Sequence, residues 1–359
     1  MKSIPLAKPI LGRHERRAVN RVLHSRSLAQ GPEVAKFELE FSKFVDDRHC
    51  VAVNSGTSAL HLALISLGVG PGDEVIVPSF TFAATANSVS LSGASPVFVD
   101  VDPKTFNIDP TLIESALTEK TKAIQVVHLY GLPANMPAIL EIAREHKLLV
   151  IEDAAQAHLA SINDQPVGTF GDAAAFSFYP TKNMTSGEGG MVVLKNPEQA
   201  RMCRLYRNQG MLAKYQNEVV GFNLRMTDIH AAIGRVQLRK LQKWTDIRIE
   251  NAHFLSQGIT GIVTPTVPPL FKHVFHQYTV RVKSNRDLFG MELSKLGIET
   301  GVYYPTQVHK LPSFKRTDEL PETQQATEQV LSLPVHPSLK MRDLRKIVRC
   351  VNQVSELLA

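Results

Sequence analysis

Between residues 50 and 195, short apolar runs alternate with segments of helical periodicity, and this alternation constrains the fold more than any other feature. The run Leu148–Ile151 is continuously apolar rather than alternating, which indicates a strand buried on both faces. Strands that alternate with helices favour crossover connections, and these produce a mostly parallel sheet flanked by helices. The sequence therefore predicts an α/β fold for this part of the chain.

The pattern also predicts where individual elements lie. We expect strands at 51–53, 74–77, 97–101, 123–128, 148–151, 173–178 and 191–194, and helices at 57–67, 82–91 and 137–146. After residue 226 the pattern changes to long helices at 227–244 and 246–256, a strand at 280–282, and helices at 285–296 and 341–358. We therefore expect a large domain at 1–245 and a smaller C-terminal α+β domain at 246–359.

Charge and cysteine content exclude several classes of protein. The net charge of +6 comes from basic residues scattered among acids, so no concentrated patch indicates nucleic-acid binding. No window approaches the roughly 20 apolar residues of a membrane span, and the N-terminus lacks a signal-peptide core. The three cysteines, at 50, 203 and 350, form no CxxC pair, so neither a disulfide framework nor a metal site is expected. We expect a cytoplasmic protein.

The segment 54–58, Asn-Ser-Gly-Thr-Ser, stands between an expected strand and an expected helix. Backbone N–H groups at a helix N-terminus favour an anion, so Gly56, Thr57 and Ser58 are candidates for a phosphate cradle. An ordinary helix cap explains the same residues. A Walker loop is absent because no GK[ST] follows, and the dinucleotide fingerprint GxGxxG is absent too.

Two further residues carry candidate chemistry. Asp153 ends a buried strand, where α/β sheets bind their ligands, and its carboxylate can pair with a protonated ring nitrogen. A structural N-cap is the alternative for Asp153. Lys182 follows a strand and precedes Gly187, Gly189 and Gly190, and a lysine with a lowered pKa is an amine nucleophile. A solvated loop lysine is the alternative for Lys182. Together, a phosphate cradle, an acid and an amine match what pyridoxal 5'-phosphate requires.

The chain also resembles the DegT/DnrJ/EryC1/StrS sugar aminotransferase family nearly from end to end. The matching stretches include NSGTSALHLAL, IEDAAQAH, SFYPTKNMTSGEGGMV and GFNLRMTDIHAAIGRVQL. The resemblance implies a pyridoxal-phosphate enzyme of the aspartate-aminotransferase fold. It also implies a homodimer whose active sites are shared between subunits.

The resemblance implies a role for each matching position. Lys182 would hold the cofactor aldehyde as a Schiff base and then transfer protons, and Asp153 would bind the ring nitrogen. Gln156 would contact the phenolic oxygen, and Phe82 would stack on the ring. Phosphate contacts would come from Thr57, Ser58, Ser177 and, across the dimer, Asn223. Substrate contacts are expected from Arg225, Tyr304 and His309.

The implied reaction transfers an amino group from glutamate to a nucleotide-linked keto-sugar. The run Thr185–Gly190, TSGEGG, is more similar to relatives that act on 4-keto sugars than on 3-keto sugars, so we expect a 4-keto hexose. The 3-keto reaction and a non-catalytic regulatory protein of the same fold remain alternatives. A dehydratase of this fold would carry histidine in place of Lys182, and a nicotinamide enzyme would need the glycine fingerprint.

Overall fold

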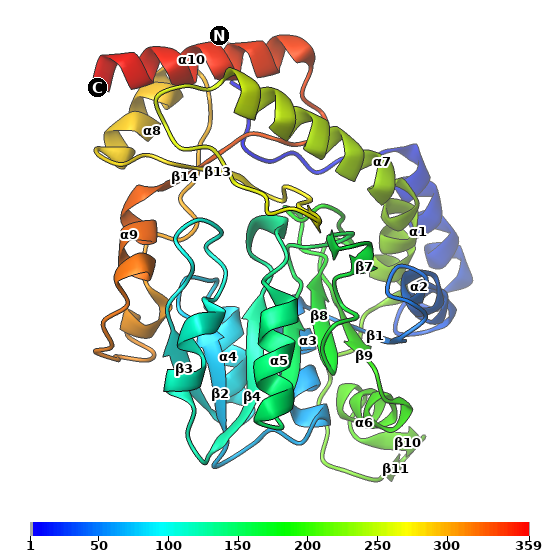
Figure 1. Cartoon of the computed structure of the whole chain (residues 1–359). Helices are drawn as coiled ribbons and strands as arrows, with labels where there is room; N and C mark the ends of the chain where they lie inside the picture. Colours follow the sequence, from blue (N-terminus) through cyan, green and yellow to red (C-terminus); the bar gives the residue numbers. More distant parts are fainter. Residues whose placement is uncertain (1–2, 359) are drawn as a thin grey trace.

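The computed structural model describes residues 3–358, and its centre is a seven-stranded sheet in the order β1-β9-β8-β5-β4-β2-β3 (Figure 1). The strands are β1 (His49–Val53), β2 (Glu74–Pro78), β3 (Ser95–Val99), β4 (Thr121–Val127), β5 (Leu149–Asp153), β8 (Ala173–Ser177) and β9 (Gly190–Leu194). Neighbours from β3 to β8 run parallel, whereas β9 runs antiparallel to both β8 and β1. The predicted mostly parallel α/β sheet is confirmed.

Helices cover both faces of this sheet, which explains why its strands are apolar on both sides. One face packs against α3 (Gly56–Ser66), α4 (Ala84–Leu91) and α6 (Pro197–Arg207). The other packs against α2 (Pro32–Ser42), α5 (Met136–Glu145) and the first half of α7 (Asp228–Gly258). In β1, Val51 and Val53 face the first cluster while Cys50 and Ala52 face the second. This is the two-sided burial expected of a strand in an α/β sheet.

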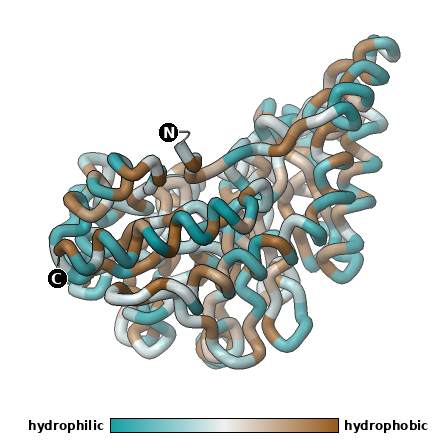
Figure 2. The backbone as a smooth tube through the Cα atoms, turned by 90° about the horizontal axis from the view of Figure 1, so that it is seen from above, coloured by the Kyte–Doolittle hydropathy of each residue, from teal (hydrophilic) through white to brown (hydrophobic). Residues whose placement is uncertain are grey.

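A second apolar core lies in the C-terminal part of the chain. It is enclosed by the antiparallel pair β13 (Tyr278–Arg281) and β14 (Val330–Leu333), by α8 (Arg286–Lys295) and α10 (Met341–Leu358), and by the second half of α7. Seen from above, hydrophobic and hydrophilic residues alternate along α10, as expected for an amphipathic surface helix (Figure 2). The predicted smaller α+β part of the fold is therefore present.

Helix α7 differs from the expectation of two helices at 227–244 and 246–256, because it continues without interruption from Asp228 to Gly258. Asp246 favours a helix cap in the sequence, yet here it is an ordinary helical position. The boundary expected at 245 falls inside this helix, which contributes Leu238 to one core and Leu255 to the other. Ile4, near the N-terminus, also packs in the second core. The division at 245 stays a prediction.

Asp100 ties the C-terminal part to the sheet. Its carboxylate accepts hydrogen bonds from the backbone N–H groups of Glu322 and Thr323 and from the Thr323 hydroxyl. It therefore caps α9 (Pro321–Gln329) from a position more than 200 residues away in the sequence. This contact fixes the N-terminus of α9 beside the carboxyl end of β3, because Asp100 directly follows Val99.

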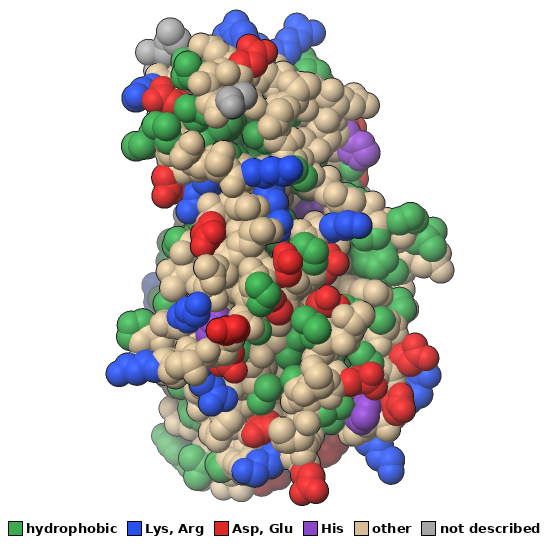
Figure 3. All heavy atoms as spheres, turned by 60° about the vertical axis from the view of Figure 1, so that its left-hand side comes forward, with side chains coloured by type: hydrophobic (Ala, Val, Ile, Leu, Met, Phe, Trp, Pro, Cys, Tyr) green, Lys and Arg blue, Asp and Glu red, His purple; other side chains and the backbone are tan. Residues whose placement is uncertain are grey.

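The surface carries basic and acidic side chains close together, and Figure 3 shows them interspersed over the visible face. Most salt bridges among the described residues are at least partly exposed, and hence of small energetic weight. None of the helices within residues 3–358 has the length and apolar character needed to cross a membrane.

Candidate active site

A cavity of about 400 Å³ lies at the carboxyl ends of the parallel strands. Asp153 and Ser177 end β5 and β8 at its floor, and Thr81 and Phe82 follow β2 at its side. The segment Ser55–Thr57 follows β1, and Tyr303 and Tyr304 reach the cavity from the C-terminal part of the chain. This is the position in which α/β sheets bind ligands, and the volume suits a cofactor or a substrate of moderate size.

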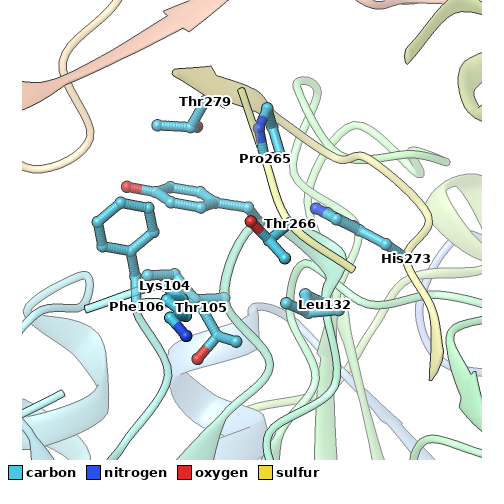
Figure 4. A pocket seen from close by; sticks show the side chains of 10 residues that line it. Lys104, Thr105, Phe106, Leu132, Pro265, Thr266, His273 and Thr279 are labelled. Atoms are coloured by element: carbon cyan, nitrogen blue, oxygen red, sulfur yellow. The ribbon is translucent and has the colours of Figure 1, made fainter. Parts of the chain in front are cut away.

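A second hollow, of about 20 Å³, lies between the loop that carries Thr105 and Phe106 and the segment that carries Pro265 and Thr266 (Figure 4). A space of this size holds about one water molecule. It therefore does not compete with the larger cavity as a substrate site.

Asp153 is 6% exposed and is held by two hydrogen bonds. Its Oδ2 accepts from the Thr85 hydroxyl at 2.8 Å, and its Oδ1 accepts from the backbone N–H of Ala155 at 3.2 Å. Burial raises the pKa of Asp153, and the Thr85 hydrogen bond and the charge of Lys182 oppose that rise. A buried carboxylate with few partners favours a cationic group beside it, such as a protonated ring nitrogen.

Lys182 lies in the same cavity, and its backbone N–H donates to the carbonyl of Tyr179 at 2.9 Å. Burial lowers the pKa of its amine to about 8, and the charge of Asp153 opposes that decrease. A lysine with such a pKa is partly neutral near physiological pH. Its amine can therefore act as a nucleophile and as a proton acceptor.

The predicted phosphate cradle is formed by the N-terminus of α3. The Ser55 side chain accepts a hydrogen bond from the backbone N–H of Ser58 at 3.1 Å, so it caps the helix. Gly56 packs so tightly against Ser177 that a Cβ on Gly56 would lie 2.8 Å from the Ser177 Cβ. The first turn of a helix leaves N–H groups without intrahelical partners, and here Gly56 and Thr57 line the cavity. Ser58 does not line it.

Gln156 and the aromatic side chains form the opposite wall. Gln156 Oε1 accepts from the backbone N–H of Tyr130 at 2.7 Å, which orients the amide so that Nε2 donates to the Tyr304 hydroxyl at 3.0 Å. Phe82 is 59% exposed although it lines a cavity, and its ring centroid lies 5.9 Å from that of Tyr304. An exposed aromatic face inside a cavity can stack on a flat ligand.

Four of the predicted site residues do not line this cavity, namely Ser58, noted above, and Asn223, Arg225 and His309. Asn223 is exposed and pairs with Asn208 in a β-bridge, and Arg225 Nη1 donates to the Asn208 side chain at 2.8 Å. His309 is fully buried, with Nδ1 2.6 Å from the Ser79 hydroxyl and Nε2 3.0 Å from the Asp318 carbonyl. A surface histidine and this buried one look the same in sequence.

Residues that the sequence did not single out also line the cavity, among them Thr81, His276, Gln277 and Tyr303, and so does Glu188 of the run Thr185–Gly190. His276 and Gln277 precede β13 and come from a segment without a recognisable motif. Tyr303 directly precedes the predicted Tyr304, so it could have been proposed from the same stretch of sequence. Thr85, which donates a hydrogen bond to Asp153, lies four residues after Thr81, and the sequence alone does not show that their hydroxyl groups meet.

The charge of the cavity is unusual for an anion site. Within residues 3–358, Lys182 is its only lysine or arginine, and Asp153 and Glu188 are carboxylates. Burial and the nearby charge of Lys182 lower the pKa of His276 well below its usual range, so His276 is neutral. The phosphate cradle of this single chain therefore relies on backbone and hydroxyl donors.

Comparison with known proteins matches residues 9–352 to the DegT/DnrJ/EryC1/StrS aminotransferase family. A pleiotropic regulatory protein of Geobacillus stearothermophilus is 44% identical, with 92% of each chain covered. GDP-perosamine synthase of Caulobacter vibrioides is 40% identical over 98% of each chain. The dTDP-3-amino-3,4,6-trideoxy-alpha-D-glucose transaminase of Streptomyces venezuelae is 42% identical, covering 94% of this chain and 91% of that protein.

Solved structures agree with this match. The Streptomyces venezuelae protein DesV superposes with a TM-score of 0.93 at 41% identity, over 95% of this chain and 94% of that one. The PLP form of the putative sugar aminotransferase Spr1654 of Streptococcus pneumoniae gives a TM-score of 0.94 at 28% identity, over 99% of this chain and all of that one.

Proposed function

The chain belongs to the DegT/DnrJ/EryC1/StrS aminotransferase family, and we propose that it uses pyridoxal 5'-phosphate to transfer the amino group of glutamate to a nucleotide-linked keto-sugar. The observation that carries this proposal is the presence of Lys182 and Asp153 in one cavity at the carboxyl end of the sheet. Relatives include a dTDP-amino-sugar transaminase and a GDP-perosamine synthase, which supports the substrate class.

The residues of the cavity fit this cofactor. When bound, pyridoxal phosphate supplies an aldehyde for amine exchange and a ring that accepts negative charge from the reacting carbon. Asp153 would hold a protonated ring nitrogen, because within residues 3–358 its buried carboxylate has only Thr85 and Ala155 as hydrogen-bond partners. Gln156 has a second Nε2 hydrogen for the phenolic oxygen, and Phe82 offers its exposed face to the ring.

Lys182 would provide the amine that meets the aldehyde and would move protons at the reacting carbon. With the pKa of Lys182 lowered to about 8 by burial, a useful fraction of the amine is neutral near pH 7 to 8. Gly56, Thr57 and Ser177 would bind the phosphate through backbone N–H and hydroxyl groups. Each residue therefore has a role that matches its contacts.

We further propose that the enzyme acts as a homodimer and that Asn223 and Arg225 serve the partner's cavity. Within residues 3–358, Lys182 is the only lysine or arginine that lines the cavity, so an arginine from a partner would add the charge that phosphate binding favours. The strand pair β10 (Met211–Ala213) and β11 (Gln216–Asn217) and the residues after it expose apolar side chains, with Tyr215 at 84% and Val220 at 91% exposure. Asn223 and Arg225 follow directly in the chain, so a second copy that covers this surface would bring them near a cavity.

The position of amination is proposed as C4, on the basis of the run Thr185–Gly190. Relatives of similar identity include a 3-amino-sugar transaminase and a perosamine synthase, so the 3-keto reaction is the second candidate. The names of two relatives favour the regulatory alternative, a pleiotropic regulatory protein of Geobacillus stearothermophilus and an erythromycin biosynthesis sensory transduction protein of Saccharopolyspora erythraea. Lys182, Asp153 and the cradle together favour catalysis over a regulatory role.

A substrate panel tests this proposal. The protein, loaded with pyridoxal phosphate, is mixed with glutamate and with GDP-, UDP- or dTDP-linked 3- and 4-keto hexoses, and products are followed by mass spectrometry. We expect one nucleotide 4-keto-sugar to gain an amino group, and we expect the Lys182→Ala variant to form none of that product. Amination of 3-keto sugars alone would contradict the C4 proposal. Amination of no keto-sugar would contradict the function itself.

A further inference from the structure

Two consecutive tyrosines line the cavity but differ in what their hydroxyl groups contact. The Tyr304 hydroxyl accepts a hydrogen bond from Gln156 Nε2 at 3.0 Å, so it is tied to the residue beside the expected cofactor. Within residues 3–358 the Tyr303 hydroxyl makes no hydrogen bond, although its backbone carbonyl accepts one from the Tyr130 hydroxyl. Tyr303 therefore brings an uncommitted polar group to the cavity.

The position of Tyr303 is set before any substrate arrives. Tyr130 is buried in a cluster with Phe80 and Phe106, and its hydroxyl holds the Tyr303 backbone. Phe106 lines the small hollow described above, and Pro265 and Thr266 line the same hollow from the opposite side (Figure 4). On its other side the Tyr303 ring lies against Gly301, where an added Cβ would come within 2.9 Å of it. Because these contacts hold the backbone and the ring of Tyr303, its hydroxyl loses little positional freedom on binding.

The chemistry of Tyr303 suits a sugar better than an anion. Burial raises the pKa of the Tyr303 hydroxyl, so the group is neutral and protonated near pH 7. Carboxylates and phosphates bind most strongly to cationic donors, whereas a neutral hydroxyl both donates to and accepts from a sugar hydroxyl. The aromatic ring also offers an apolar face to the C–H groups of a sugar ring.

We propose that Tyr303 determines specificity for the amino acceptor, through a hydrogen bond between its hydroxyl and a hydroxyl of the sugar ring. The Tyr304 hydroxyl instead positions the side chain of Gln156. This inference rests on the proposed function, because it requires a nucleotide-linked keto-sugar as acceptor. The two neighbouring tyrosines therefore have different roles. Tyr303 acts in one half of the reaction, and Tyr304 acts in both.

The matched variants Tyr303→Phe and Tyr304→Phe test this separation. Each protein is loaded with cofactor, and the two half-reactions are followed by absorbance: glutamate with the pyridoxal form, and a GDP-linked 4-keto-6-deoxyhexose with the pyridoxamine form, or whichever keto-sugar of the panel the wild type aminates. We expect Tyr303→Phe to lower the ratio of the sugar rate constant to the glutamate rate constant by about threefold to tenfold, as for one lost neutral hydrogen bond. We expect Tyr304→Phe to slow both half-reactions and to shift the cofactor absorbance.

The cofactor content and the far-ultraviolet circular dichroism of each preparation report whether the variant is loaded and folded. An unchanged ratio in Tyr303→Phe would overturn the assignment of Tyr303 while leaving the proposed function intact. A wild-type protein that aminates no keto-sugar of the panel would instead overturn the proposed function and this inference with it.

Deoxy acceptors give a second, independent measurement. Analogues that lack the hydroxyl on either carbon beside the ketone are compared with the parent sugar in wild type and in Tyr303→Phe. We expect the wild type to discriminate against one analogue and Tyr303→Phe to lose that discrimination. Equal discrimination by the two enzymes against every analogue would overturn the proposed hydrogen bond.

Discussion

Thr85 donates a hydrogen bond from Oγ1 to Oδ2 of Asp153 over 2.8 Å, and both side chains are buried. Because the Thr85 hydrogen is committed to Asp153, the 2.9 Å contact between the Thr81 and Thr85 hydroxyls has Thr81 as donor. A short chain of hydroxyls thus runs from the side of the cavity to the carboxylate. The hydrogen bond from Thr85 stabilises the charged form of Asp153 and so opposes the rise in pKa that burial causes.

We predict that Thr85→Val weakens cofactor binding by about tenfold, since a buried carboxylate loses a hydrogen bond worth about 1 to 2 kcal/mol. Fluorescence titration of the cofactor-free protein with pyridoxal phosphate measures the effect. Thr85→Ser is the matched control, because it retains the hydroxyl, and it should bind nearly as well as the wild type. Equal affinity for Thr85→Val and the wild type would show that Asp153 does not depend on this contact.

We predict that Gly56→Ala weakens cofactor binding by about tenfold or more. The new methyl group would lie 2.8 Å from the Ser177 Cβ, so the N-terminus of α3 must move away from Ser177 and the cradle widens. Gly290→Ala in α8 is the control, because its Cβ meets only the Thr300 Oγ1 at 3.3 Å and the Leu331 side chain at 3.6 Å. If both variants bind the cofactor alike, the cradle does not hold the phosphate.

The fold was predictable from sequence to the extent that it follows from local pattern. The continuously apolar run Leu148–Ile151 overlaps β5, which spans Leu149–Asp153 and is buried between helices on both faces, as a run without polar alternation predicts. The sequence predicted two helices where α7 is a single one, because nothing near Thr245 in the sequence shows that both cores pack against the same helix.

The candidate site was predictable where its residues follow strands. Asp153 and Ser177 end β5 and β8, and position at a strand end identifies them. His309 was expected in the cavity, but its hydrogen bonds to Ser79 and Asp318 hold it in the interior, and such long-range contacts leave no local pattern. Tyr303 and His276 reach the cavity through the arrangement of the C-terminal part, which sequence periodicity does not specify.

The low pKa of Lys182 predicts a pH dependence of stability in the cofactor-free protein. Burial lowers this pKa from 10.5 to about 8, so between these values the unfolded chain binds more protons than the folded one. The free energy of unfolding should therefore rise with pH across that window, by about 3 kcal/mol in total, at roughly 1.4 kcal/mol for each pH unit between the two pKa values. The difference between wild type and Lys182→Met in urea unfolding isolates this contribution. A pH-independent difference would contradict the burial of the amine.

Glu152 should be essential for stability although it lies beside Asp153. Its carboxylate accepts hydrogen bonds from the N–H groups of Gly168, Phe170 and Gly171 and from His128 Nε2. Burial raises the pKa of Glu152, but these hydrogen bonds outweigh it and the net pKa is lowered. This stabilisation is present above about pH 4.5 and is lost as the pH falls below it. We predict that Glu152→Gln lowers the free energy of unfolding by about 3 kcal/mol at pH 7. A loss below about 1 kcal/mol in urea unfolding would contradict this network.

The central claim is that the amine of Lys182 meets the cofactor. Borohydride reduction of the cofactor-loaded protein, followed by proteolysis and mass spectrometry, tests it most directly. The account predicts a phosphopyridoxyl label on the peptide that contains Lys182, and no reducible adduct in Lys182→Ala. A label on a different lysine of the wild type, or a reducible adduct that survives in Lys182→Ala, would contradict it.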